Sequence, residues 1–256
     1  MGSVDADVLI ARVRDDPSHA GVFCDFDGTL SEIVEDPEES RPVAGAVEAL
    51  TALGQAYAKV AVISGRPARF LQSHLGSEGL LLAGLYGLEV VRDGEVEVAE
   101  DARRWQPAVD EAVARARREG PEGLHVEPKG LSVTLHFRSA PQLADAAREL
   151  ADRLAEQSGL AVGEGRQSFE LRPPLSTSKG SVVAEAAAGL DAACFLGDDQ
   201  GDLTAFDALD ALAGRGARTL RVAVRSGESP DELLRRSDLV VDGPREVVAL
   251  LEKLRP

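Results

Sequence analysis

The chain has 256 residues, 44% of them hydrophobic, which is enough for one large domain or two small ones with a packed core. Its formal net charge of -16 argues against nucleic acid or an anionic membrane surface as a partner. No signal-peptide pattern and no apolar run of membrane-spanning length is visible. Cys24 and Cys194 lie in apolar runs, so we expect buried free thiols and a reducing, intracellular compartment.

Hydrophobic periodicity divides the chain into three segments. Before residue 100 and after residue 177, helix patterns alternate with buried-strand patterns, which is typical of a parallel sheet. The helices expected there are 5–16, 43–53, one after Pro67, 178–188, 203–212, a short one with Ser229 as N-cap, and 246–254. The strands expected are one ending at Asp25, 57–63, 80–85, a hairpin of 88–91 and 95–98 turning at Asp93-Gly94, 192–196, 219–224 and 239–241. The acidic stretch 31–41 indicates a loop.

The middle segment shows a helix–strand–strand pattern twice, which indicates an α+β unit with an antiparallel sheet. Its expected elements are helices 102–119 and 141–157 and strands 124–127, 131–138, 161–164 and 169–172. Within 132–138 the alternation places one set of side chains toward the helices, Val133, Leu135 and Phe137, and the other set on a polar face, Ser132, Thr134, His136 and Arg138. That face is either solvated or turned toward a site. The predicted fold is therefore an α/β, Rossmann-like parallel-sheet core (1–100 and 175–256) with an inserted α+β unit (101–174).

Two carboxylates, Asp25 and Asp27, follow the first buried strand. Ligands of open parallel sheets bind at the carboxyl ends of strands, so chemistry is expected here. Adjacent carboxylates repel each other unless a cation lies between them, and Mg²⁺ is held by such groups together with a phosphate. An Asp can also attack phosphorus while a second Asp moves a proton. Alone, the pair also fits a glycosyltransferase metal site, whereas the preceding Val-Phe-Cys argues against an EF-hand.

Three further signals stand at strand ends or helix starts. Ser64 is either a phosphate contact or only the N-cap of the next helix. Lys179 lies in the first turn of a helix, where a cation opposes the helix dipole, so we expect an anion beside it. Asp198, Asp199 and Asp202 repeat the acidic pattern at another strand end.

These motifs together resemble the haloacid dehalogenase superfamily of phosphatases across the whole expected core. Closer similarity to the trehalose-6-phosphate phosphatase family extends over nearly the full length, in Ile63-Ser-Gly-Arg66, Gly84-Leu-Tyr-Gly-Leu-Glu89, Glu127-Pro-Lys129, 132–138, Glu170-Leu-Arg-Pro173, Lys179-Gly180 and Gly197-Asp-Asp. Two departures are Leu85-Tyr86-Gly87, where that family usually has Ser-His-Gly, and Gly201-Asp202-Leu203-Thr204, where it usually has Thr-Asp-Glu-Asp.

The resemblance implies hydrolysis of trehalose 6-phosphate through an aspartyl-phosphate, in trehalose biosynthesis in the cytoplasm. Asp25 would be the nucleophile and Asp27 the proton donor and base, while Ser64 and Lys179 would bind the phosphoryl group. The Mg²⁺ cofactor would be held by Asp25, the backbone carbonyl of Asp27, Asp198 and Asp199. Asp199 and Asp202 would help to hold the metal's water or orient its ligands, and which of these Asp202 does stays open. Sugar-phosphate contacts would come from Gly65, Arg66, Tyr86, Gly87, Glu127, Lys129 and Glu170.

The inserted unit would act as a cap for sugar recognition, hinged near Glu100 and Pro173-Pro174 and closing over substrate. We expect a monomer or weak homo-oligomer. Because Tyr86 replaces the usual His, another disaccharide or pseudo-disaccharide phosphate is an alternative substrate. A non-catalytic sugar-phosphate-binding protein is a further alternative, although the intact acids and Lys179 argue against it.

Overall fold

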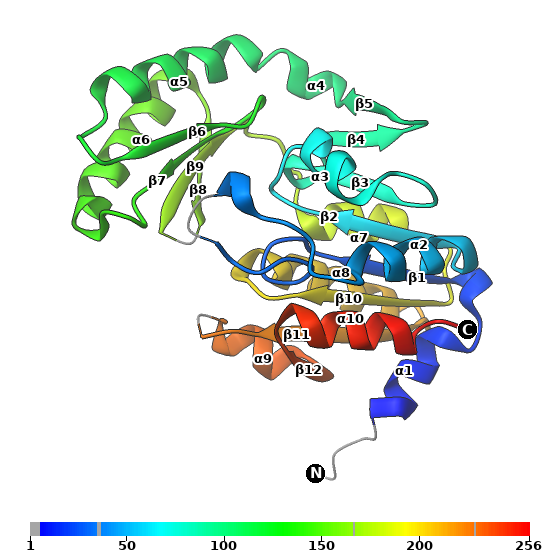
Figure 1. The fold of residues 1–256 in the computed structure, drawn as a ribbon. Helices are drawn as coiled ribbons and strands as arrows, with labels where there is room; N and C mark the ends of the chain where they lie inside the picture. The colour runs from blue at the N-terminus through cyan, green and yellow to red at the C-terminus, as the bar shows by residue number, and fades with distance from the viewer. Residues whose placement is uncertain (1–5, 35–36, 166, 228) are drawn as a thin grey trace. The chain divides into compact units, whose positions relative to one another are not determined.

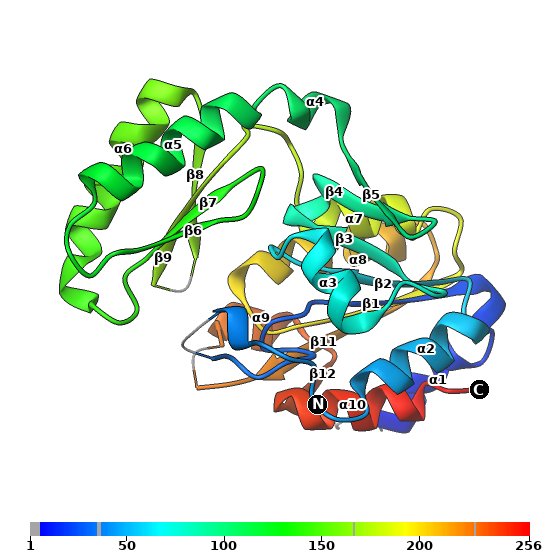
Figure 2. The ribbon, with the colours of Figure 1, turned by 45° about the horizontal axis from the view of Figure 1, so that its top comes forward.

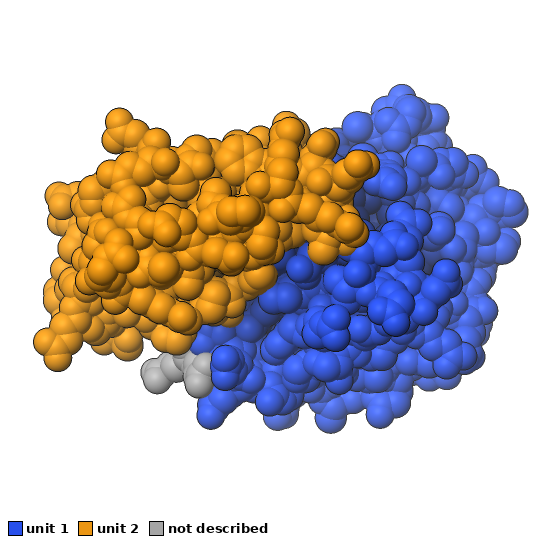
Figure 3. All heavy atoms as spheres, turned by 90° about the horizontal axis from the view of Figure 1, so that it is seen from above, with its two compact units in different colours: residues 1–97, 177–256 blue, residues 98–176 orange. Residues whose placement is uncertain are grey.

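The computed structural model describes residues 6–34, 37–165, 167–227 and 229–256. The chain forms two compact units, Met1–Glu97 with Thr177–Pro256 (unit 1) and Val98–Ser176 (unit 2), coloured separately in Figure 3. The boundaries expected from the sequence, 1–100 with 175–256 for the core and 101–174 for the insert, differ from these units by a few residues. The first expected helix would begin at Asp5, which lies outside the described residues. None of the helices within the described ranges combines the length and apolar character that a membrane span requires.

Unit 1 is built on an eight-stranded sheet in the order β12-β11-β10-β1-β2-β3-β4-β5 (Figure 1). Its strands are β1 (Ala20–Cys24), β2 (Lys59–Ile63), β3 (Leu81–Gly84), β4 (Glu89–Arg92), β5 (Glu95–Val98), β10 (Ala192–Gly197), β11 (Arg218–Arg225) and β12 (Leu239–Asp242). The pairs from β12 to β3 are parallel, and β4 joins β3 antiparallel. This confirms the predicted α/β fold class with a parallel-sheet core.

Helices cover both faces of this sheet (Figures 1 and 2). They are α1 (Ala6–Arg14), α2 (Ala46–Ala56), α3 (Ala68–Leu75), α7 (Lys179–Ala186), α8 (Leu203–Ala213), α9 (Asp231–Arg236) and α10 (Gly243–Lys253). Successive strand residues serve opposite cores: Val22 and Cys24 pack with α1, α2, α3 and α10, whereas Phe23 packs with α7, α8 and α9. Burial on both faces explains why these strands read as continuous apolar runs.

Two local predictions in unit 1 have contrasting outcomes. Asp93 and Gly94 have φ of 49° and 80°, the left-handed pair that a two-residue hairpin turn needs, which confirms the turn between β4 and β5. Ser229 is not the N-cap of α9: Pro230 holds that position without a side-chain cap. The Ser229 hydroxyl instead accepts from the Ser226 N–H at 2.8 Å and donates to the Val224 carbonyl at 3.1 Å.

Unit 2 is a four-stranded antiparallel sheet in the order β6-β7-β9-β8, with helices on one face. Its elements are α4 (Glu100–Arg103), α5 (Gln106–Glu119), β6 (His125–Pro128), β7 (Val133–His136), α6 (Ala144–Ser158), β8 (Ala161–Gly165) and β9 (Ser168–Arg172). The single helix expected over 102–119 is wrong in one respect, since it breaks between α4 and α5. Pro107 lies in the first turn of α5, where no intrahelical N–H donor is needed. In the interior of one continuous helix the missing N–H of Pro107 would remove a hydrogen bond.

Candidate active site

Asp25 stands where β1 ends, between β10 and β2. Its N–H donates to the Leu196 carbonyl at 2.9 Å, so strand pairing fixes the backbone of this residue. The chain passes from β1 to β2 on one side, and β10 later adds on the other, which makes the β1 end a topological switch point. Binding sites in open α/β sheets form at such points. The side chain of Asp25 is buried there.

Lys179 is the buried cation of this site. Its Nζ lies 2.7 Å from Asp202 Oδ1, 3.0 Å from Asp25 Oδ2 and 3.6 Å from Asp199 Oδ1. Ser178 caps α7 through a reciprocal capping box with Ser181, as the expected helix start requires. The anion expected beside Lys179 is thus supplied by carboxylates of the chain itself. Burial alone would lower the pKa of Lys179, but the neighbouring carboxylates outweigh it and raise that pKa well above its ordinary value.

Asp202 organises the acidic loop after β10. One of its oxygens accepts the N–H groups of Asp198 at 2.8 Å and Asp199 at 2.9 Å, and the other accepts from Lys179. Asp199 in turn accepts the Asp202 N–H at 3.2 Å. The resemblance leaves the role of Asp202 open, yet an acid three residues after Asp199 is the spacing of a capping box. That spacing was the available signal for its positioning role.

The carboxylates of the site suit a divalent cation. Asp25, Asp199 and Asp202 each place one oxygen within 4.8 Å of the others, and Asp198 is buried beside them. The pKa of Asp25 is raised to about 8, chiefly by burial and also by the charges of Asp199, Asp198 and Asp27, while Lys179 offsets part of the increase. One lysine does not neutralise this much negative charge, and hard oxygen donors are what Mg²⁺ binds. The residues present therefore fit a Mg²⁺ ion, the cofactor that the sequence resemblance implies.

Ser64 follows β2 and does not cap α3, whose N-cap is Pro67 without a side-chain hydrogen bond. The Ser64 hydroxyl instead accepts the Arg66 N–H at 3.2 Å inside the turn. This removes the N-cap interpretation and leaves a buried hydroxyl at the same sheet edge as Asp25. Whether Ser64 contacts phosphate stays a prediction.

Tyr86 lies in a strained turn after β3, with φ of 58° and ψ of 30°. Its N–H donates to the Ser64 carbonyl at 3.0 Å, so the β2 and β3 turns are joined. A Cβ at Gly65 would lie 2.6 Å from the Tyr86 hydroxyl oxygen, which explains the glycine there. Gly87 follows with φ of 97°. Gly65, Arg66, Tyr86 and Gly87 are therefore neighbours of the Ser64 turn in the folded unit.

The remaining predicted residues belong to unit 2 and form a group of their own. Strand register places Glu127, Thr134 and Glu170 directly opposite one another on β6, β7 and β9. Glu127 Oε2 lies 2.7 Å from His136 Nε2 and 3.5 Å from Lys129 Nζ, and Glu170 accepts from the Ser132 hydroxyl at 2.7 Å. Val133, Leu135 and Leu171 face the helices instead.

Gly28 is required by the approach of Asp198. Its φ is +78°, and a Cβ would lie 2.2 Å from Asp198 Oδ2. We expect Gly28→Ala to destabilise the fold by about 1–3 kcal/mol through strain and contact, and to weaken Mg²⁺ binding by displacing Asp198. Thermal unfolding with and without Mg²⁺ measures both effects. Gly94→Ala is the matched control, since Gly94 has φ of +80° and nothing within 4 Å of its Cβ position; equal losses in the two variants would leave only backbone strain.

Comparison with known proteins shows the family to which the chain belongs. A family model described as trehalose-phosphatase matches residues 23–238. A trehalose-phosphate phosphatase of Mycolicibacterium paratuberculosis is 34% identical over 249 residues, covering 92% of this chain and 62% of that protein. The chain thus spans less than two thirds of that relative's length.

Two solved structures share the fold. The C-terminal domain of a Candida albicans trehalose-6-phosphate phosphatase aligns with a TM-score of 0.79 at 22% identity, covering 100% of this chain and 99% of that one. A haloacid dehalogenase-like hydrolase from Bacteroides thetaiotaomicron aligns with a TM-score of 0.61 at 15% identity, covering 92% and 97%. These similarities confirm the haloacid dehalogenase-like fold. Since the family model also matches most of its length, the chain belongs to the trehalose-phosphatase family.

Proposed function

We propose that the chain is a Mg²⁺-dependent phosphatase that hydrolyses trehalose 6-phosphate to trehalose and phosphate. The observation that carries this proposal is the buried Lys179 held between Asp25 and Asp202, beside further carboxylates at the β1 and β10 ends. A cation and an acidic cluster in one buried site suit a phosphoryl group and a metal together. The family of the chain supplies the substrate class.

In this mechanism an Asp25 oxygen attacks phosphorus and the bond to the sugar oxygen breaks, which leaves an aspartyl-phosphate. Asp27 donates a proton to the departing oxygen and then takes one from the water that hydrolyses the intermediate. Lys179 stabilises negative charge on the nucleophile and on the phosphoryl oxygens, and the Ser64 hydroxyl binds the phosphoryl group. Mg²⁺, when held by Asp25, the Asp27 backbone carbonyl, Asp198 and Asp199, supplies further neutralisation of phosphoryl charge.

Unit 2 would recognise the sugar. Carboxylates and an ammonium offer several strong hydrogen bonds to hydroxyl-rich ligands, and Glu127, Lys129 and Glu170 provide them from one sheet. We propose that this unit acts as a cap hinged at its two connections to unit 1 and that it closes over substrate. Fixed domain angles with and without ligand in solution scattering would contradict the hinge.

A second substrate is favoured by one observation. Tyr86 fills the space above Gly65 in the turn that joins Ser64, where family members usually carry a smaller His ring. The same chemistry would then act on another disaccharide or pseudo-disaccharide phosphate. We further propose a cytoplasmic role in trehalose biosynthesis, because the buried thiols of Cys24 and Cys194 are free. We also propose that the protein is a monomer or a weak homo-oligomer.

Phosphate release across a panel of sugar phosphates with Mg²⁺ tests the proposal. We expect trehalose 6-phosphate to be hydrolysed at least about tenfold faster than glucose 6-phosphate, because the larger sugar makes more contacts. Removal of metal by EDTA should abolish release, and added Mg²⁺ should restore it. Preference for a different phosphorylated sugar would keep the mechanism and move the substrate. Silence on every sugar phosphate and on p-nitrophenyl phosphate would leave a non-catalytic binding protein.

A further inference from the structure

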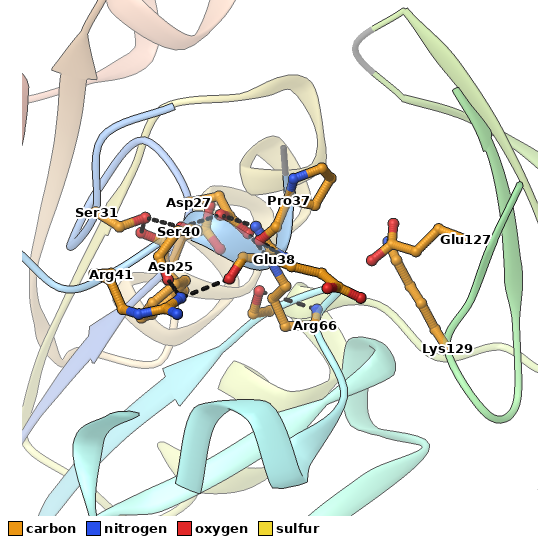
Figure 4. A network of polar contacts seen from close by, with 12 residues as sticks. Asp25, Asp27, Ser31, Pro37, Glu38, Ser40, Arg41, Arg66, Glu127 and Lys129 are labelled. Atoms are coloured by element: carbon orange, nitrogen blue, oxygen red, sulfur yellow. Dashed lines mark hydrogen bonds and ion pairs between the residues drawn. The ribbon is translucent and has the colours of Figure 1, made fainter. Parts of the chain in front are cut away.

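Both carboxylate oxygens of Asp27 are held by donors from unit 1. Arg66 Nε donates to Oδ2 at 2.7 Å, and Arg66 Nη2 donates to Oδ1 at 2.7 Å. The Ser40 hydroxyl donates to Oδ1 at 3.1 Å (Figure 4). A bidentate guanidinium pair fixes the plane of a carboxylate as well as its position. Asp27 is therefore oriented about its side-chain axis, which a single hydrogen bond would not achieve.

Arg66 is itself held in place. Its Nη1 donates to the Pro37 carbonyl at 2.6 Å, and its guanidinium carbon lies 4.7 Å from the centroid of the Phe70 ring. The side chain of Arg66 is 9% exposed, whereas that of Asp27 is 38% exposed. The guanidinium of Arg66 is thus buried and hydrogen-bonded within unit 1, whereas the carboxylate of Asp27 that it holds remains accessible to solvent.

The segment before α2 supplies both supports. The short 3₁₀ turn Pro37–Glu39 carries the carbonyl that binds Arg66, and Ser40, which follows it, donates to Asp27. The Ser40 hydroxyl also lies 2.9 Å from that of Ser31, which fixes the turn at its other side. The acidic stretch that reads as a plain loop in the sequence therefore connects Arg66, Ser40 and Asp27 in one network (Figure 4).

We propose that Arg66 is a positioning residue that acts through Asp27 and is not a substrate ligand. This inference rests on the proposed function, in which Asp27 moves the proton of the leaving sugar oxygen. It departs from the substrate-binding role that the sequence resemblance implies for Arg66. The geometry supports it because the three guanidinium nitrogens already donate to the chain, two of them to the residue that performs proton transfer.

The two roles of Arg66 predict different kinetics for Arg66→Gln. A positioning residue changes kcat with little change in KM, and it matters most when the leaving group needs a proton. We expect kcat/KM for the best sugar phosphate of the panel to fall about 100-fold, almost entirely through kcat. For p-nitrophenyl phosphate, whose leaving group departs without a proton, kcat/KM should change less than about threefold.

Three further variants complete the test. Arg66→Lys should recover only part of kcat, because an ammonium does not form the bidentate pair. Ser40→Ala should shift the same parameters in the same direction by a smaller factor. Arg69→Gln, at an exposed position of α3, is the matched control and should resemble the parent protein. An increased KM for both substrates with kcat unchanged would overturn the proposal, since Arg66 would then bind the phosphate.

A crystal structure of Arg66→Gln tests the positioning directly and does not depend on activity. We expect the Asp27 carboxylate to leave its present orientation or to occupy more than one rotamer, while Asp25 and Lys179 stay in place. An unchanged Asp27 in that variant would overturn the proposal even if the enzyme proved inactive on every phosphate. Failure of trehalose 6-phosphate as a substrate, with p-nitrophenyl phosphate still hydrolysed, would affect only the proposed substrate.

Discussion

Asp25→Asn is expected to abolish phosphate release, lowering kcat by about four to six orders of magnitude. The amide does not attack phosphorus, and the other carboxylates of the site do not replace Asp25 because Lys179 and the acidic loop hold Asp199 and Asp202 in place. Initial rates on the best sugar phosphate measure the loss. Asp16→Asn, at a partly exposed carboxylate of unit 1, is the control and should retain full activity. A residual rate within tenfold of the parent protein would show that Asp25 is not the nucleophile.

The same variant should change stability in the metal-free protein. The pKa of Asp25 is raised to about 8, chiefly by burial, from its ordinary value of 3.8. Between these values the folded state binds a proton that the unfolded state does not, so the free energy of unfolding falls as pH rises through this window, by up to about 1.4 kcal/mol per pH unit. Asp25→Asn should flatten this dependence and make the metal-free protein more stable at pH 8.

Chemical denaturation at several pH values in EDTA provides that measurement. Mg²⁺ should stabilise the parent protein most at the alkaline end of this pH range, where the Asp25 carboxyl is deprotonated and can bind the metal. It should stabilise Asp25→Asn much less. Metal-free stability that rises with pH across this window would contradict a buried Asp25 with a raised pKa.

Lys179→Met is the second large expected effect. Removing the cation leaves Asp25 and Asp202 buried together without compensation, and breaking a buried ion pair in this way costs about 3–5 kcal/mol. Both urea unfolding and activity should show the loss. Lys253→Met is the matched control, because the Lys253 ammonium is exposed and its pair with Asp7 contributes little.

A double-mutant cycle separates charge from packing at Lys179. Asp202→Asn alone should also destabilise, since it weakens the bond to Lys179 and the acceptor for the Asp198 and Asp199 N–H groups. Combined with Lys179→Met it should cost less than the sum of the two single changes, because one unpaired charge is then absent. Additive losses would show that the two side chains do not interact.

Some of these features follow from sequence alone because they depend on neighbouring residues. The hairpin turn needs only Asp93-Gly94, whose residues tolerate the left-handed region, and the start of α7 needs only Ser178 and Ser181. The buried strand before Asp25 follows from its apolar run, and with it the position of Asp25 at a strand end. The order of motifs along the chain likewise indicates the fold and family, both of which the comparisons confirm.

Other features depend on residues far apart in the chain. Lys179 and Asp202 are 23 positions apart, Ser132 and Glu170 are 38 apart, and Arg66 and Asp27 are 39 apart. Local patterns carry no information on which distant donor meets which acceptor, so the pairing of Asp202 with Lys179 and the support of Asp27 by Arg66 and Ser40 do not emerge from the sequence. The failed N-cap at Ser229 has a different, local cause: its hydroxyl bonds Ser226 and Val224, a few positions earlier in the chain, in preference to the helix start.

Apolar periodicity and the order of motifs along the chain are therefore enough to predict the parallel-sheet core, the strand ends at which the acids stand, and the family. The partners of those acids, meaning the carboxylates that surround Lys179 and the cation that orients Asp27, become visible only in the folded chain. The physical reason is that strand and turn formation follows short-range propensity and apolar periodicity, whereas buried charges are satisfied by whatever partners the completed fold brings within hydrogen-bond distance.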